Sequence, residues 1–98
     1  MTQNASIVYV GNKPPMNYVM ALMQGFSMTD TGEVFLKARG RAISTAVDVA
    51  EITRRRFMTS IEVSQITIGT EELEAREGGT KGVSTIEILL SIPSKKTK

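Results

Sequence analysis

Cysteine and histidine are both absent from this chain of 98 residues. Their absence excludes disulfides, thiolate chemistry and imidazole general bases, and it removes the ligands of nearly all zinc sites. A composition without cysteine is typical of cytosolic proteins. We therefore expect a cytoplasmic protein that uses no metal and no other cofactor.

Long apolar segments are missing as well. No hydrophobic run approaches the roughly 18 residues that a membrane-spanning helix requires, and the polar segment 1–6 does not resemble a signal peptide. The segment 11–15 has one glycine and two prolines, so it is not a glycine-rich nucleotide-binding loop. We expect no membrane association. The length fits one domain over residues 1–98, with a mobile basic tail at 93–98.

Groups that could carry out catalysis are sparse. The carboxylates lie in separate predicted elements, and no nucleophile–base pair can be assembled without histidine or cysteine. Ser44, Thr45 and Asp48 share one face of a predicted helix, but this spacing is ordinary for a surface. We therefore predict that the chain is not an enzyme.

Charge is unevenly distributed along the chain, although its net value is only +2. Residues 37–56 contain six cationic side chains and two carboxylates, whereas residues 70–82 contain four glutamates against Arg76 and Lys81. Charge gathered in one segment says more about a partner than the total does. The basic segment indicates an anionic partner.

Hydrophobic spacing predicts the order of the elements. Alternating apolar residues predict strands, and apolar residues at i, i+3, i+4 and i+7 predict helices. The predicted order is βαβαββ. The predicted strands are 6–10, 33–38, 61–69 and 83–92, and the predicted helices are 16–27 and 41–57, with Ile43, Ala46, Val47 and Ala50 on the buried face of the second helix.

The third predicted strand and the segment after it are less regular. The apolar phase changes between Ile61 and Ile68, which indicates either a bulge or burial on both faces. The next 13 residues, 70–82, are mostly polar, with Gly78 and Gly79 near the tip. Loops of this length are usually functional or disordered. We interpret this one as a β-arm that extends beyond the body.

Two predicted turns could bind phosphate. The step Arg39-Gly40-Arg41 sets two guanidinium groups beside a glycine, where the backbone can approach a phosphate and a helix N-terminus follows. Lys13 also precedes a predicted helix and could hold one phosphate. A solubilising turn explains the first feature equally well, and a capping turn explains the second.

The end of the second predicted helix carries Arg54, Arg55 and Arg56, followed by Phe57. Cations at this end stabilise the negative end of the helix dipole. Three in succession, however, spread over more than half of the helix circumference, so at least one should face a partner or the surface. Phe57 fits either the core or an interface, and the residues alone favour the core.

Three motifs lie in order on the predicted elements: GNKPPMNYV at 11–19, KARGRAIS at 37–44 and VSTIEI at 83–88. Together they resemble the Alba family, small archaeal chromatin proteins that bind DNA and RNA, and the likeness runs from Ile7 to Ile92. The resemblance implies an α/β fold, an α+β sandwich in which two helices pack on a mixed four-stranded sheet. It also implies a symmetric dimer whose arms reach along the minor groove.

The resemblance gives roles to several of these residues. It implies that Lys13, Arg39 and Arg41 form the basic body that contacts DNA between the arms. Phe57 occupies the position at which family dimers pack against one another along DNA, which favours the interface over the core.

Two departures from the family pattern are visible. Asn12 stands where members commonly have a lysine that is acetylated, so this switch and one cationic contact per subunit are missing. The arm is also more acidic than a minor-groove finger should be. Either its glutamates point away from DNA, with Arg76 and Lys81 toward it, or the arm adds little affinity. Both departures suit a paralogue that binds differently from the common member or pairs with it.

We therefore predict a sequence-tolerant, chromosome-associated protein that coats and compacts double-stranded DNA as a homodimer. The alternatives are an RNA-binding protein and a paralogue that acts mainly in a heterodimer. Contacts should be mainly to phosphates, and the candidate contact residues are Lys13, Arg39, Arg41, Arg54, Arg55, Arg56, Arg76 and Lys81.

Overall fold

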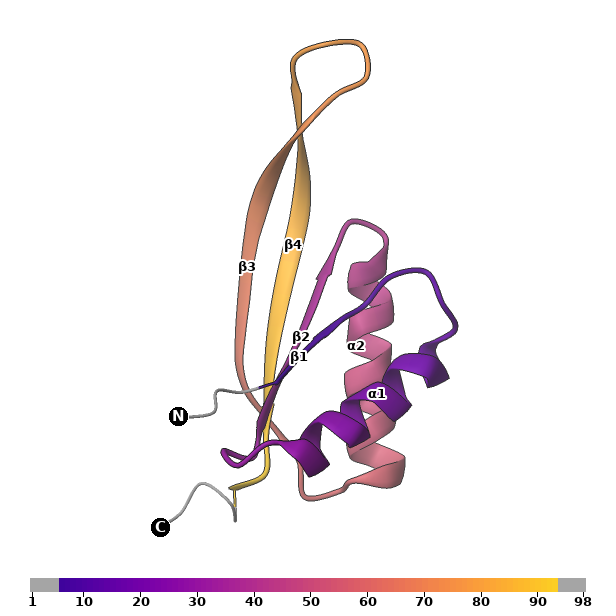
Figure 1. Ribbon diagram of the computed structural model, residues 1–98, viewed down its shortest axis with the longest axis vertical. Coiled ribbons are helices and arrows are strands. Elements are labelled where there is room, and N and C mark those ends of the chain that lie inside the picture. The colour runs from indigo at the N-terminus through magenta and orange to yellow at the C-terminus, as the bar shows by residue number, and fades with distance from the viewer. Residues whose placement is uncertain (1–5, 94–98) are drawn as a thin grey trace.

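A computed structural model describes residues 6–93 of the chain (Figure 1). Its element order confirms the predicted βαβαββ arrangement. The elements are β1 (Ser6–Tyr9), α1 (Pro15–Met28), β2 (Glu33–Arg39), α2 (Ala42–Ile52), a π-helical turn (Thr53–Phe57), β3 (Glu62–Glu74) and β4 (Thr80–Ser91). The mobile tail predicted at 93–98 falls almost wholly outside the described residues.

The four strands form one mixed sheet in the order β1-β2-β4-β3. β1 pairs with β2 in parallel, and β4 is antiparallel to both of its neighbours. Both helices lie on the same side of the sheet (Figure 1). Alternate residues of the two central strands therefore point into a core beneath the helices. The core includes Val19, Leu22 and Phe26 of α1, Val34 and Leu36 of β2, and Ile88 and Leu90 of β4.

The second helix differs from its prediction in two ways. Val47, expected in the buried face, is 43% exposed, whereas Val49 is completely buried. The buried face consists of Ala46, Val49, Ala50 and Thr53, which keep the i, i+3, i+4, i+7 spacing. Regular α-helix also ends at Ile52 instead of reaching 57.

The last turn of this helix is wider than an α-helical turn. The amide of Met58 donates to the carbonyl of Thr53 at 2.7 Å, an i to i−5 bond. The hydroxyl of buried Thr53 donates to the carbonyl of Val49 at 2.8 Å. The three successive arginines and Phe57 all lie in this turn.

The predicted β-arm is confirmed, but its strands are longer than expected. β3 continues to Glu74 and β4 begins at Thr80, so only residues 75–79 form the turn between them. Gly78 and Gly79 adopt positive φ angles of 102° and 76° at this turn. The arm rises well beyond the body, and the molecule measures 51 × 30 × 19 Å (Figure 1). Because both faces of this arm are exposed, its strands lack the apolar alternation used for the prediction.

The phase change in β3 is a bulge. The register with β4 shifts between Val63 and Gln65, and this shift confirms one of the two expected explanations. Burial on both faces, the other explanation, is wrong. Ile66 and Ile68 pair with the buried Ile88 and Ile86, yet they are 57% and 77% exposed because the helices do not reach that part of the sheet.

Candidate nucleic-acid interface

The turn between β1 and α1 is fastened by one buried tyrosine. The hydroxyl oxygen of Tyr18 accepts hydrogen bonds from the amides of Gly11 and Lys13, each at 3.0 Å. A Cβ at Gly11 would lie 3.3 Å from that oxygen, so glycine permits this close approach. Pro15 at the first position of α1 limits the turn on its other side. The exposed side chain of Lys13 therefore extends from a fixed backbone.

The turn between β2 and α2 has an equally specific conformation. Arg39 ends β2, Gly40 has a φ of 59°, and Arg41 immediately precedes α2. Gly40 donates to the carbonyl of Ser84 at 2.9 Å and accepts from the amide of Ile43 at 3.1 Å. The positive φ strongly favours glycine here. The turn separates the two arginines from each other while keeping both at the same end of the sheet.

The two turns line one groove. Because β1 and β2 are parallel neighbours, their carboxyl ends meet at the same edge of the sheet, where ligands of open α/β sheets commonly bind. Lys13, Arg39 and Arg41 all line an open groove there, with a volume of about 520 Å³. The other lining residues are Val10, Gly11, Asn12, Ala42 and Thr45. The structure thus brings together the three residues that the family resemblance grouped, and Asn12 lines the same groove.

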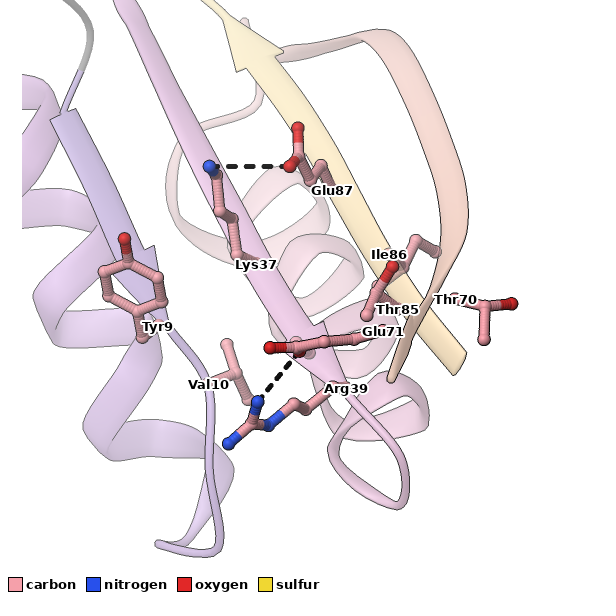
Figure 2. A pocket seen from close by; sticks show the side chains of 10 residues that line it. Tyr9, Val10, Lys37, Arg39, Thr70, Glu71, Thr85, Ile86 and Glu87 are labelled. Atoms are coloured by element: carbon pink, nitrogen blue, oxygen red, sulfur yellow. Dashed lines mark hydrogen bonds and ion pairs between the residues drawn. The ribbon is translucent and has the colours of Figure 1, made fainter. Parts of the chain in front are cut away.

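One cation of this groove already has a carboxylate partner. Arg39 Nη1 lies 2.8 Å from Oε1 of Glu71 on the arm, with the two side chains 56% and 46% exposed (Figure 2). Sequence reasoning missed this contact, because the residues are 32 positions apart and no local spacing links them. Among residues 6–93, neither Lys13 nor Arg41 forms an ion pair with a carboxylate. Their positive charges are therefore not offset by a local partner.

The arginines after α2 do not join this groove. Arg41 and Arg56 lie at opposite ends of the helix, roughly 20 Å apart at 1.5 Å per residue. Glu51 pairs with Arg54 at 2.7 Å and with Arg55 at 3.0 Å. The hydrogen bonds from Arg54 and, next, from Arg55 hold the pKa of Glu51 below its ordinary value.

The next two residues of that helix end lack such a partner. In the described part of the chain no carboxylate pairs with exposed Arg56. The side chain of Phe57 is 47% exposed. Arg56 and Phe57 thus present a charge and an apolar ring at the surface.

The remaining candidate cations belong to the arm. Arg76 is in the turn at the tip and Lys81 is near the start of β4, opposite Leu73. Both are exposed, and no described carboxylate forms an ion pair with either. They are therefore available on the part of the molecule that extends farthest from the body.

The described residues were also searched for a metal site and for a membrane-spanning helix. Positions 6–93 contain no cluster of three or more acidic side chains arranged to hold a metal ion. Over that range no helix is long and apolar enough to cross a membrane.

Comparison with known proteins gives a consistent result. Residues 6–70 match the family model described as Alba. The chain is 54% identical over 91 residues to DNA/RNA-binding protein Alba 1 of Archaeoglobus fulgidus, covering 93% of this chain and 98% of that protein. It is 50% identical over 92 residues to DNA/RNA-binding protein Alba of Methanocella arvoryzae, covering 94% and 95%.

A solved structure is also similar. The fold matches that of Alba from Thermoplasma volcanium with a TM-score of 0.81 and 45% sequence identity, over 88% of this chain and 99% of that one. The family resemblance seen in the three motifs is thereby confirmed.

Proposed function

This chain belongs to the Alba family of non-enzymatic chromatin proteins, and we propose that it binds double-stranded DNA with little sequence preference, coating and compacting it as a dimer. The relatives are named as DNA/RNA-binding proteins. The proposed setting is the chromosome in the cytoplasm. The proposed DNA contacts are those predicted from the sequence, with the groove as their centre.

The observation that carries this proposal is the groove at the carboxyl ends of β1 and β2. Lys13, Arg39 and Arg41 come from two separate turns, yet they line one surface. Arginine donates paired hydrogen bonds to phosphate oxygens and keeps its charge at every physiological pH. Contacts of this kind position a protein on DNA without reading its sequence. The groove therefore supports sequence-tolerant binding.

A dimer is supported by the uncovered apolar surface beside the arm. Val63, Ile66 and Ile68 of β3 are 40%, 57% and 77% exposed, and β3 is an edge strand of the sheet. Soluble proteins generally cover or charge such an edge. We propose that a second copy covers it, which would give the dimer two basic grooves and two arms. Arg76 and Lys81 would then extend the contact along the DNA.

The exposed residues Arg56 and Phe57 support contacts between neighbouring dimers on DNA. Phe57 is half-exposed beside Arg56 at the end of α2 that is remote from the groove. An exposed aromatic ring is a common anchor in protein interfaces. We propose that it contacts the neighbouring dimer on DNA, while Arg56 and its adjacent arginines contact phosphates.

Salt dependence tests the proposal. Lys13, Arg39 and Arg41, together with one or two of the arginines at 54–56, would give about eight to ten phosphate contacts in a dimer. Counterion release then predicts a log–log slope of about −7 to −9. Fluorescence anisotropy with unrelated DNA duplexes across a salt series measures this slope. A slope shallower than about −3 would refute binding through phosphate neutralisation.

A pair of double variants tests the position of the interface. Lys13→Ala/Arg41→Ala should weaken binding to unrelated duplexes by similar factors. Arg54→Ala/Arg55→Ala removes the same charge from residues that already pair with Glu51, so its effect should be smaller. Equal effects of the two double variants would refute a groove-centred interface. The same titrations with duplex RNA test the alternative target that the names of the relatives support.

A further inference from the structure

The sheet has a second polar surface, on the face that the helices leave open. Tyr9, Lys37 and Glu87 are partners in register across β1, β2 and β4. Figure 2 shows these side chains in front of the sheet, with the helices behind it. The same residues line a groove of about 610 Å³, together with Arg39, Glu71 and Thr85. This volume is within the usual range for sites that hold small organic groups.

Tyr9 is the unusual member of this surface. Its side chain is 70% exposed, whereas its neighbour Val10 is only 7% exposed. Large aromatic side chains usually contribute to cores or interfaces, because their burial is strongly favourable. Tyr9 contributes to no core here, and its ring projects from β1 beside the groove (Figure 2).

We propose that this open face binds unpaired bases of single-stranded RNA, with Tyr9 as the stacking platform. Stacking needs a base that is outside a duplex, so this site is distinct from the duplex-binding groove and goes beyond the function proposed above. A four-stranded sheet that exposes aromatic rings on the face opposite its helices is an established arrangement for holding single-stranded RNA. Stacking on an exposed ring is tolerant of sequence, because every base has a π-face.

The groups beside Tyr9 match the rest of a ribonucleotide. Lys37 and Glu87 are 3.4 Å apart and together offer a donor and an acceptor to the edge of a stacked base (Figure 2). Thr85 faces Gly69, so no side chain covers it from β3. The carboxylate of Glu87 can accept a hydrogen bond from a ribose 2′-hydroxyl, and the hydroxyl of Thr85 can donate a hydrogen bond to the oxygen of that 2′-hydroxyl. Deoxyribose lacks that hydroxyl, so these groups favour RNA over single-stranded DNA.

Arg39 links the two surfaces. It lines both the groove beside Tyr9 and the basic groove that contains Lys13 and Arg41. An RNA strand with a base on Tyr9 can therefore place a neighbouring phosphate at Arg39. The RNA backbone would thus run from the ring of Tyr9 past Arg39 into the basic groove.

The test compares Tyr9→Ala with Tyr9→Phe in anisotropy titrations with a labelled, unstructured oligouridine. Loss of base–aromatic stacking should weaken binding of Tyr9→Ala about 5- to 150-fold. Tyr9→Phe keeps the ring and should bind within about twofold of the wild type. Met20→Ala, at a 65% exposed apolar position on α1, is the matched control and should have no effect. Duplex DNA affinity should be unchanged in all three variants, because paired bases cannot stack on Tyr9.

Several results would overturn the proposal. One is that Tyr9→Ala binds oligouridine with unchanged affinity. Another is that Tyr9→Ala loses the same factor in affinity for oligouridine and for duplex DNA. Oligodeoxyuridine binding as tightly as oligouridine would refute the assignment to RNA. A photo-crosslink from 4-thiouridine RNA to the wild-type protein, mapped by mass spectrometry, tests the site without any variant. It should fall on Tyr9 or its strand neighbours, and a crosslink confined to other segments would overturn the site. Failure of the duplex titrations alone would instead count against the function proposed above.

Discussion

Replacing Glu71 with glutamine should tighten binding to duplex DNA. The carboxylate of Glu71 lies 2.8 Å from Arg39, one of the three cations that line the basic groove. A DNA phosphate that uses the Arg39 guanidinium must compete with this carboxylate, which also repels it. Glutamine keeps nearly the same shape and removes the charge. The substitution therefore isolates the competition between arm and phosphate.

The expected size of the effect follows from the exposure of the pair. Both side chains are about half exposed, and ion pairs at such sites contribute about 0.2–1 kcal/mol. Two pairs in a dimer give about 0.4–2 kcal/mol, which corresponds to about 2- to 30-fold tighter binding. The gain should decrease at high salt, because screening weakens the competing pair.

Glu72→Gln is the matched control for this experiment. It makes the same change in net charge one residue farther along the arm, where the side chain lies on the opposite face of the strand. Anisotropy titrations of both variants against one duplex, over a salt series, give the comparison. Equal gains for the two variants would mean that only net charge matters. Weaker binding by Glu71→Gln would mean that Glu71 holds Arg39 in its binding position. Either result refutes the competition argument.

Three further predictions concern other parts of the surface. Asn12→Lys adds a cation to the basic groove, so it should tighten DNA binding and steepen the salt slope by about one to two units per dimer; an unchanged slope would mean that this side chain does not reach phosphate. Phe57→Ala should barely lower the melting temperature, because the ring is 47% exposed, but it should lower the Hill slope of DNA titrations; a fall in stability near the 3–5 kcal/mol of a buried Phe would place it in the core. Hydrogen bonds from Arg54 and then Arg55 lower the pKa of Glu51, so its contribution to stability is present above the ordinary glutamate pKa and is lost as the pH falls through the lowered value. Glu51→Gln should therefore flatten the acid side of a plot of melting temperature against pH, and an unchanged plot would show that these hydrogen bonds add no measurable stability.

Much of the fold could be predicted because its core follows simple periodicities. Val34 and Leu36 are completely buried on one face of β2, whereas Glu33, Phe35 and Lys37 alternate with them on the other face, and two prolines mark the start of α1. The arm was harder to delimit, since a two-stranded ribbon exposed on both faces needs no apolar alternation. Val47 and Val49 could not be ranked by spacing alone, because either fits an apolar stripe. Packing against the sheet decides between them.

The candidate interface could be predicted only in part. The Arg39–Arg41 turn and Lys13 are visible as local basic motifs, but their shared groove depends on the parallel pairing of β1 with β2. The sequence held one weak sign that Tyr9 is exposed: it lies between two valines, directly before a polar turn. The prediction of the interface did not use this sign. Its exposure depends on the absence of a second layer over that face, which no local pattern encodes.

The cations of the basic groove differ in whether they form an ion pair, and this difference cannot be read from the number of charged residues. Arg39 and Glu71 are distant in sequence and adjacent in space, whereas Lys13 and Arg41 share the groove without a carboxylate partner among residues 6–93. The basic surface thus contains both committed and available cations. Lys13 and Arg41 would contact a phosphate without displacing a carboxylate. Arg39 would have to give up its ion pair with Glu71 to contact a phosphate. We expect Glu71 to compete with phosphate for Arg39, which also lines the groove on the open sheet face. A change at Glu71 should therefore alter RNA as well as DNA binding.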